Sequence, residues 1–224
     1  MADKVLFITG ASTGIGAQTA RQAAQAGWRV ALFARSEDKL NDLAREIGEA
    51  AIAVPGDVTD LSSLGDAVRE TLDKFGTINA VFANAGTGLD TPGIENGDPD
   101  EWSKLVDINI KGVLLTLKAT YAALKKSKGH LVLTGSVAGR VHISGSVYGA
   151  SKWFVHGFAG NMSTEMREWG GRCTVVAPGM VDTPFFNEAK PDKLKPEDIA
   201  NAVVYAIDQP AHANVQEIVV MPTG

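Results

Sequence analysis

Short apolar runs and longer amphipathic stretches alternate along the whole chain. The apolar runs are rich in β-branched residues and lie at 4–10, 29–35, 51–57, 78–86, 130–136, 172–179 and 216–222. They are apolar throughout rather than at every second position, which is typical of strands buried on both faces. The amphipathic stretches between them predict helices near 15–26, 37–49, 60–74, 99–127, 147–169 and 196–208.

Helix start signals support this division of the chain. Asp98 and Pro99 precede the fourth predicted helix, and Pro196 opens the last one. Regular alternation of strands and helices favours an α/β protein with a parallel, doubly wound sheet and helices on both faces. Segments 86–98 and 183–196 are the least regular. Both follow predicted strand ends, where ligands bind in open α/β sheets.

Composition narrows the class of protein. The 224 residues, of which 45% are hydrophobic, suit one domain with a sizeable core. The net charge of −5 gives no reason to expect a nucleic-acid partner. No apolar run is long enough to span a membrane, and "MADK" leads into the first strand without a signal region. We therefore expect a cytoplasmic protein with a single domain over residues 1–224 and no nucleic-acid or membrane partner.

Cysteine and histidine usage gives no sign of a disulfide or a metal. Cys173 is the only cysteine and lies inside an apolar run, so we expect a buried, inert thiol. The four histidines, at 130, 142, 156 and 212, are scattered along the chain. The sequence therefore predicts no metal site.

A glycine-rich segment joins the first strand to the first helix. In "TGASTGIG", residues 9–16, Gly10, Gly14 and Gly16 lead into a helix that begins near Ile15. Glycines allow a tight turn and close backbone approach, and the helix N-terminus offers free N–H groups to a pyrophosphate. The spacing is G-x-x-x-G-x-G rather than the commoner G-x-G-x-x-G. A purely structural turn is the alternative.

Tyr148 and Lys152 lie four residues apart in "YGASK", on one face of a predicted helix. A nearby cation favours the phenolate, so we expect Lys152 to lower the pKa of Tyr148. Tyr148 could then act as general acid in carbonyl reduction and general base in alcohol oxidation. Ser136 ends the fifth strand, where its hydroxyl could hold the substrate oxygen. The alternatives are an ordinary helix surface pair and a strand-end turn serine.

Five motifs occur together in a fixed order: "TGASTGIG", "NAG" at 84–86, "GS" at 135–136, "YGASK" at 148–152 and "APG" at 177–179. In this order the chain resembles the short-chain dehydrogenase/reductase family over nearly its whole length. The resemblance implies a single-domain, Rossmann-like sheet of about seven parallel strands and a nicotinamide cofactor.

The resemblance also implies roles for individual residues. The catalytic set would be Asn109, Ser136, Tyr148 and Lys152, with Asn109 holding a water and Lys152 also binding the nicotinamide ribose. Asp57 would contact the adenine, and Asn84 would tie the loop after the fourth strand to the cofactor. The full cofactor-binding set would be Gly10, Ser12, Thr13, Gly14, Ile15, Gly16, Arg35, Ser36, Asp57, Val58, Asn84, Ala85, Gly86, Tyr148, Lys152, Pro178, Gly179, Val181 and Thr183.

The end of the second strand bears on the choice of cofactor. An acidic residue there would bind the 2′-hydroxyl of NAD, whereas arginine suits the 2′-phosphate of NADP. In "FARSED", Ala34 stands at the acidic position, and Arg35 and Ser36 follow. The segment favours NADP(H) over NAD(H). A merely solvated Arg35 is the alternative.

The segment after Thr183 is short for the family, which predicts an open or small substrate pocket. Its expected lining is mostly apolar: Leu89, Val137, Ala138, His142, Ile143, Phe185 and Phe186. The last residues resemble those of NADP-dependent 3-hydroxy acid and general alcohol dehydrogenases.

We therefore expect an NADP(H)-dependent oxidoreductase that interconverts a small-molecule carbonyl and a secondary alcohol. A non-catalytic NADP(H)-binding regulator on the same fold is the alternative. A sugar-nucleotide epimerase is a third reading, but it would need a further sugar-binding domain. The family commonly assembles through the helices that carry Asn109 and Tyr148, so we expect a homodimer or homotetramer.

Overall fold

The computed structural model describes residues 4–91, 93–186 and 188–223 and contains one sheet of seven parallel strands. The strands are β1 (Lys4–Thr9), β2 (Trp28–Ala34), β3 (Ala51–Pro55), β4 (Ala80–Ala83), β5 (His130–Thr134), β6 (Arg172–Pro178) and β7 (Glu217–Val220). Their order across the sheet is β3-β2-β1-β4-β5-β6-β7, and every neighbouring pair is parallel. The predicted α/β fold with a doubly wound, Rossmann-like sheet is confirmed.

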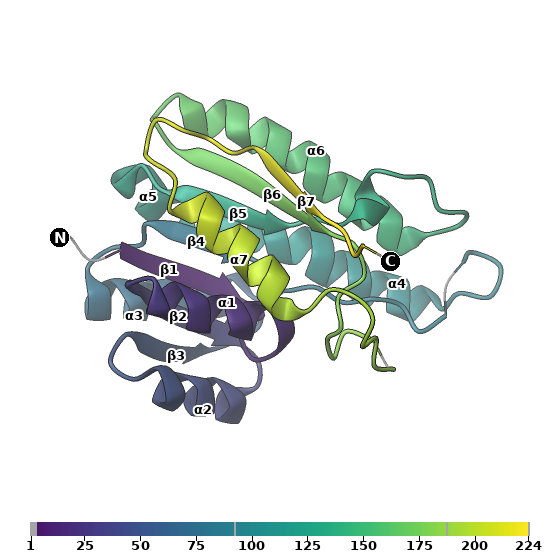
Figure 1. The fold of residues 1–224 in the computed structure, drawn as a ribbon, viewed down its shortest axis with the longest axis horizontal. Helices are drawn as coiled ribbons and strands as arrows, with labels where there is room; N and C mark the ends of the chain where they lie inside the picture. Colours follow the sequence, from purple (N-terminus) through teal and green to yellow (C-terminus); the bar gives the residue numbers. More distant parts are fainter. Residues whose placement is uncertain (1–3, 92, 187, 224) are drawn as a thin grey trace.

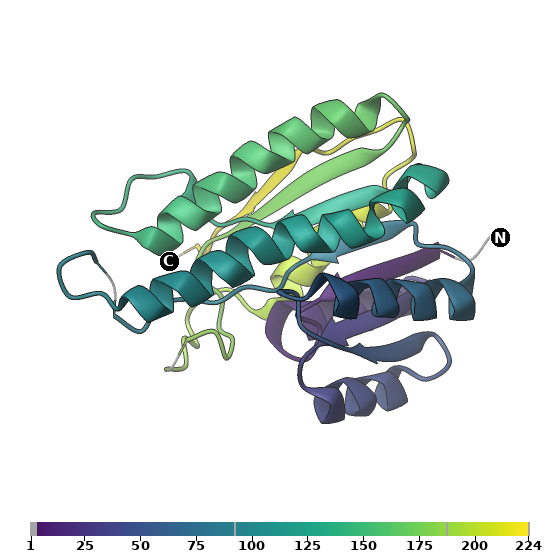
Figure 2. The same ribbon diagram turned by 180° about the vertical axis from the view of Figure 1, so that it is seen from behind.

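Helices cover both faces of this sheet. They are α1 (Gly14–Gln25), α2 (Glu37–Ile47), α3 (Leu61–Phe75), α4 (Pro99–Val106), α5 (Gly112–Ser127), α6 (Val147–Arg167) and α7 (Pro196–Ile207). Figure 1 shows α1 and α7 in front of the sheet, and Figure 2 shows α3, α5 and α6 in front of its other face. The central strands are therefore covered on both sides, which explains why their runs are apolar throughout, whereas the edge strands β3 and β7 are only partly buried.

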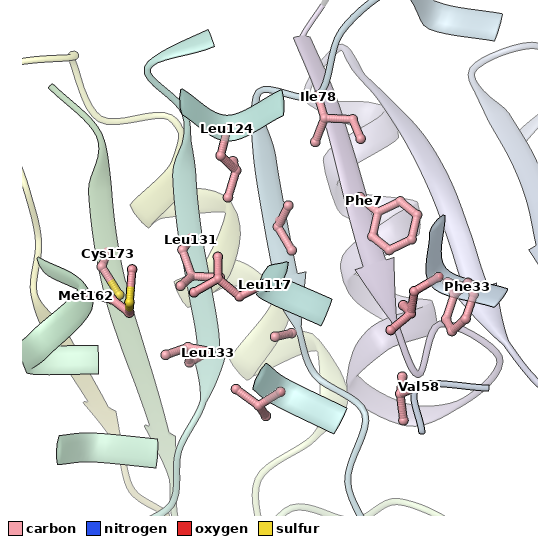
Figure 3. Close-up of a cluster of buried hydrophobic side chains, with 14 of the residues drawn as sticks. Phe7, Phe33, Val58, Ile78, Leu117, Leu124, Leu131, Leu133, Met162 and Cys173 are labelled. Carbon is pink, nitrogen blue, oxygen red and sulfur yellow. The ribbon is translucent and has the colours of Figure 1, made fainter. Parts of the chain in front are cut away.

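The core consists of two apolar clusters, one on each side of the sheet. Strand residues alternate between them: Phe7 belongs to the cluster under α3, α5 and α6, whereas Leu6 and Ile8 belong to the cluster under α1, α2 and α7. Figure 3 shows the first cluster, which runs from Phe33 to Met162 beside Cys173. Cys173 is buried, as expected, and burial raises the pKa of its thiol to about 12, which disfavours the reactive thiolate.

The predicted helix over 99–127 is helical throughout, but it is not a regular α-helix. Asp98 caps its start by accepting a hydrogen bond from the N–H of Asp100 at 2.9 Å, as the sequence predicts. At Asp107–Lys111, between α4 and α5, the helix widens into one π-helical turn, η1. Asn109 lies in this turn and is only 1% exposed. π-helical turns often occur at functional sites, and this one contains Asn109, which the family resemblance places in the catalytic set.

The chain changes direction across the sheet between β1 and β4. All seven strands are parallel, so their carboxyl ends lie at the same edge of the sheet. In open α/β sheets, ligands bind in the crevice at this edge, at the point where the strand order reverses. Among the described residues no helix is both long and apolar enough to cross a bilayer.

Candidate active site

A cavity of about 380 Å³ follows the carboxyl ends of the strands. Its walls come from the loop after β1, the ends of β2 to β5, the start of α6 and the segment after β6. All the predicted cofactor-binding residues line it except Gly16, and Ser136 lines it as well. Gly16 and Asn109 do not line the cavity, and their expected roles stay predictions.

The glycine loop has the backbone shape that the sequence predicts. Gly10 and Gly14 have φ angles of 66° and 54°, in the left-handed region that side chains disfavour. A Cβ on Gly16 would lie 2.3 Å from the carbonyl oxygen of Gly10, so Gly16 serves the packing of the loop. Thr13, the residue before α1, makes no side-chain capping hydrogen bond. The Thr13 side chain therefore does not cap the N–H groups at the start of α1, and this helix end faces the cavity. Free N–H groups at a helix N-terminus suit a phosphate group.

Asn84 joins three strand ends. Its Nδ2 donates to the carbonyl oxygens of Thr9 at 3.1 Å and Gly10 at 3.3 Å, and its Oδ1 accepts from the Thr134 hydroxyl at 3.1 Å. The amide therefore ties the loop after β4 to the glycine loop, and its expected role toward the cofactor stays a prediction. Asn84 lines the cavity and fixes its floor.

The cofactor-selecting residues lie at one end of the cavity. Arg35 is exposed there beside Ser36 and Ala34. Asp57 lies opposite, and its Oδ1 accepts from the N–H and the hydroxyl of Thr59, both at 2.9 Å. The guanidinium of Arg35 is exposed at the rim, and position 34 carries no acidic residue. This end of the cavity therefore favours an anionic group.

Tyr148 and Lys152 lie at the opposite end, on the first two turns of α6. Lys152 is 6% exposed, its Nζ donates to the Thr134 carbonyl oxygen at 2.9 Å, and it lies 5.7 Å from the centre of the Tyr148 ring. Burial lowers the pKa of Lys152 to about 8. The pair predicted from "YGASK" is therefore assembled, with the lysine enclosed by protein.

The pKa of Tyr148 moves opposite to the expectation from sequence. Burial raises it above the ordinary value, and a hydrogen bond with Ser136 opposes that rise. Desolvation favours the neutral phenol, and Lys152 does not offset it in the protein alone. The expected lowering is therefore wrong for the protein without ligands. The neutral phenol is the form that can donate a proton.

Ser136 has two contacts at the start of the short 3₁₀ helix η2 (Val137–Gly139). Its hydroxyl oxygen accepts from the N–H of Ala138 at 3.1 Å, and the hydroxyl also hydrogen-bonds Tyr148. The strand-end serine is thus both a turn residue and a neighbour of the phenol.

Asn109 holds backbone rather than facing the cavity. Its Oδ1 accepts from the N–H of Thr87 at 2.8 Å, and its Nδ2 donates to the Thr87 carbonyl at 2.9 Å and the Ser151 hydroxyl at 3.3 Å. These bonds use both N–H groups and one lone pair of the side-chain amide, and the expected role of Asn109 in holding a water stays a prediction. Asn109 fixes the loop after β4 against α6.

Phe185 and Phe186 line the cavity, as predicted. The Phe185 ring centre lies 5.7 Å from that of Tyr148, and a Cβ on Gly88 would lie 3.0 Å from Phe185 Cζ. Five other predicted lining residues do not line the cavity: Leu89, Val137, Ala138, His142 and Ile143. His142 instead stacks on Trp153, with ring centres 5.4 Å apart.

Sequence reasoning missed several residues that line the cavity: Thr87, Lys104, Ile108, Thr134 and Gly135. Lys104 and Ile108 come from α4 and the π turn, and only the tertiary packing of that segment brings them to the strand ends. In the described ranges, no three His, Cys, Asp or Glu side chains gather in a way that could hold a metal ion.

Comparison with known proteins decides the family. The family model described as short chain dehydrogenase matches residues 4–194. The chain belongs to this family. An uncharacterized oxidoreductase of Staphylococcus epidermidis is 38% identical over 227 residues, covering 98% of this chain and 97% of that protein. Membership in the short-chain dehydrogenase family confirms the resemblance and the oxidoreductase class.

Solved structures of the family superimpose on the whole fold. An alcohol dehydrogenase from Thermococcus sibiricus complexed with 5-hydroxy-NADP has a TM-score of 0.90 and 31% identity, covering 98% of this chain and 97% of that one. A 3-ketoacyl-(acyl-carrier-protein) reductase from Brucella melitensis complexed with NADH has a TM-score of 0.91 and 26% identity, with the same coverage. The short-chain dehydrogenase fold therefore occurs with either type of nicotinamide cofactor.

Proposed function

We propose that this protein is an NADP(H)-dependent oxidoreductase that interconverts a small-molecule carbonyl and a secondary alcohol, with Tyr148 as the general acid and base. The observation that carries the proposal is the enclosed Lys152 beside Tyr148, at one end of a cavity whose other end carries Arg35. A regulator that only binds the cofactor has no need of a buried lysine, which costs stability because its charge is desolvated.

The residues that would hold NADPH are already in place. The N-terminus of α1 and the glycine loop suit the pyrophosphate, and Arg35 with Ser36 suits the 2′-phosphate. When bound, NADPH supplies the hydride for the carbonyl carbon. Lys152 would anchor the nicotinamide half, since it is the cation nearest to Tyr148.

Tyr148 and Ser136 would act on the substrate oxygen. Ser136 holds the carbonyl oxygen by donating a hydrogen bond, and Tyr148 gives the proton that completes the alcohol as the carbon receives the hydride. Because burial raises the pKa of Tyr148, the phenol is protonated at neutral pH and is ready for reduction. Oxidation needs the phenolate, so its rate should rise as the pH becomes alkaline.

NADP(H) is proposed over NAD(H) because the end of β2 carries Arg35 and no acidic residue at position 34. The Thermococcus alcohol dehydrogenase, which was solved with 5-hydroxy-NADP, supports this choice. Small aldehydes, ketones and 3-oxo compounds are the proposed substrates. The exposed ring of Phe185 and the half-buried ring of Phe186 suit an apolar group beside the carbonyl. Homo-oligomer formation and cytoplasmic location remain predictions from the sequence.

A substrate panel tests the proposal. The probes are benzaldehyde, acetophenone and ethyl acetoacetate with NADPH or NADH, and 3-hydroxybutyrate and L-serine with the oxidised cofactors. Turnover is followed by nicotinamide absorbance, and cofactor binding by fluorescence. We expect reduction of at least one carbonyl probe, faster with NADPH. Tight NADPH binding without turnover on any probe would favour the regulator instead.

A further inference from the structure

His156 connects the substrate end of the cavity to the edge of the sheet. It lies on α6 one turn after Lys152, and its Nε2 lies 3.1 Å from the carbonyl oxygen of Ser136. Its Nδ1 lies 3.2 Å from Oε1 of Glu217 on β7. Oε2 of Glu217 accepts from Nη2 of Arg140 at 2.8 Å. A continuous row of polar groups thus runs from Arg140 to the serine that touches Tyr148.

Two glycines leave the space that the His156 ring occupies. A Cβ on Gly135 would lie 2.8 Å from His156 Nε2, and a Cβ on Gly139 would lie 2.7 Å from His156 Cδ2. These glycines flank Ser136 on both sides in the chain. The imidazole, 15% exposed in its side chain, therefore packs against the backbone that carries the serine.

Both partners of the ring are hydrogen-bond acceptors. The Ser136 carbonyl can only accept, so Nε2 must carry a proton. In the neutral ring, Nδ1 then has a lone pair facing Glu217, whose Oε1 is buried and makes no hydrogen bond among the described residues. Only the doubly protonated ring can donate to both groups, so Glu217 favours the protonated ring, whereas the bond to Ser136 forms in either protonation state.

The charges around His156 oppose one another. Burial lowers its pKa most strongly, the Ser136 carbonyl and Glu217 raise it, and Arg140 and Lys152 lower it again. The net pKa lies below the ordinary value for histidine. At neutral pH the ring is thus uncharged and holds Ser136 through Nε2 alone.

We propose that His156 is a positioning residue that fixes the backbone of Ser136 through Nε2 and thereby aims the Ser136 hydroxyl at the substrate oxygen beside Tyr148. This inference rests on the proposed function, and it gives a structural role to a residue that is not one of the four expected catalytic residues. A misplaced catalytic group can cost about 100-fold in rate, so a residue that holds Ser136 should affect kcat more than cofactor affinity.

Three variants test this role with the best carbonyl probe of the panel. His156→Leu removes the bond to Ser136 at similar volume, whereas His156→Gln keeps an amide N–H that can reach the carbonyl. His212→Leu is the matched control, because His212 is exposed and lies outside the cavity. We expect His156→Leu to lower kcat by about 10- to 100-fold with unchanged NADPH affinity. His156→Gln should recover most of the rate, and the control should match wild type.

Equal losses in His156→Leu and His156→Gln, or wild-type kcat in His156→Leu, would overturn the proposal. A second readout does not depend on turnover or on the folding of a variant. The ¹⁵N spectrum of histidine-labelled wild type should show neutral His156 with its proton on Nε2, and Glu217→Gln should lower the pKa of His156 further. A neutral ring whose only proton lies on Nδ1 would refute the contact with Ser136. Failure of the proposed function would appear separately, as wild-type protein with no turnover.

Discussion

The two ends of the cavity are built in different ways. At the cofactor end, left-handed glycines and the side chain of Asn84 fix the backbone through contacts within the protein. At the substrate end, Phe185 is 43% exposed and rests on Tyr148 from a segment between β6 and α7. The shape of the first end is therefore fixed by the main chain. The shape of the second end depends on a side chain that is exposed and that a ligand would bury. The difference predicts that substitutions at the two ends affect different kinetic constants.

Tyr148→Phe should have the largest effect. It removes the proton donor and leaves the ring packed on Phe185, so the fold and NADPH affinity should be retained. Proton transfer by a placed side chain contributes about 100- to 10,000-fold, and kcat should fall by that factor. Turnover and NADPH affinity are measured on the same preparation. A kcat close to that of wild type would remove Tyr148 from the chemistry.

Arg35→Ala tests the cofactor end. Hydrogen bonds to a charged group contribute about 1.5–3 kcal/mol, which corresponds to about 10- to 150-fold in affinity. We expect NADPH to bind more weakly by that factor and NADH to be unaffected, because only NADPH carries the 2′-phosphate. Equal weakening of both cofactors would show that Arg35 supports the loop.

Ala34→Asp sharpens the same comparison. It places an anion where the 2′-phosphate would lie and an acceptor where NADH has a ribose hydroxyl. The preference should move toward NADH, while KM for the carbonyl stays the same. The dissociation constants of both cofactors are measured at low and at high salt. A contact between charges that are open to solvent weakens as salt is added, whereas an enclosed contact changes little.

The pKa of Lys152 predicts how NADPH affinity depends on pH. Burial lowers this pKa to about 8, so the ammonium loses its proton as the pH rises through that value. If NADPH binds only the charged form, its dissociation constant should rise by at most about tenfold per pH unit above the pKa. Fluorescence titrations at several pH values measure this, with Lys152→Met as the control that should abolish the dependence. An equally steep rise in Lys152→Met would assign the effect to another group.

Phe185→Leu should have the smallest effect and should act at the substrate end alone. Aromatic pairs contribute about 0.5–1.5 kcal/mol beyond their buried area, which corresponds to about 2- to 13-fold. We expect KM for an aromatic carbonyl such as benzaldehyde to rise within that range, without a change in NADPH affinity. Phe186→Leu is the control, because Phe186 packs on Phe185. Weaker binding of NADPH to Phe185→Leu would contradict the claim that the two ends of the cavity act on different kinetic constants.

The sequence predicts the fold and the cofactor end better than the substrate end, for a physical reason. Strands, helices and the glycine turn depend on short patterns such as residues 9–16, whose backbone requirements are local. The π turn at Asp107–Lys111 depends instead on a contact between Asn109 and Thr87, which are 22 positions apart. No pattern in the chain indicates that contact.

Electrostatics of the site could not be predicted from spacing alone. The spacing of four positions from Tyr148 to Lys152 correctly places both side chains on one face of α6, but it gives no measure of burial. Burial by the surrounding chain raises the pKa of the phenol and lowers that of the amine. The predicted pocket lining failed at His142 for the same kind of reason, because its ring stacks on Trp153.

Transfer of deuterium from labelled NADPH tests the central claim most directly. Wild-type protein is incubated with each carbonyl probe and NADPH that carries deuterium on the nicotinamide ring carbon that donates the hydride, in a preparation of each ring face. The alcohol is analysed by mass spectrometry, with Tyr148→Phe as the matched control. The account predicts an alcohol with one deuterium on the former carbonyl carbon from one ring-face label, at a rate greatly reduced in Tyr148→Phe. Absence of deuterated alcohol from both labels, or equal rates in the two proteins, would contradict it.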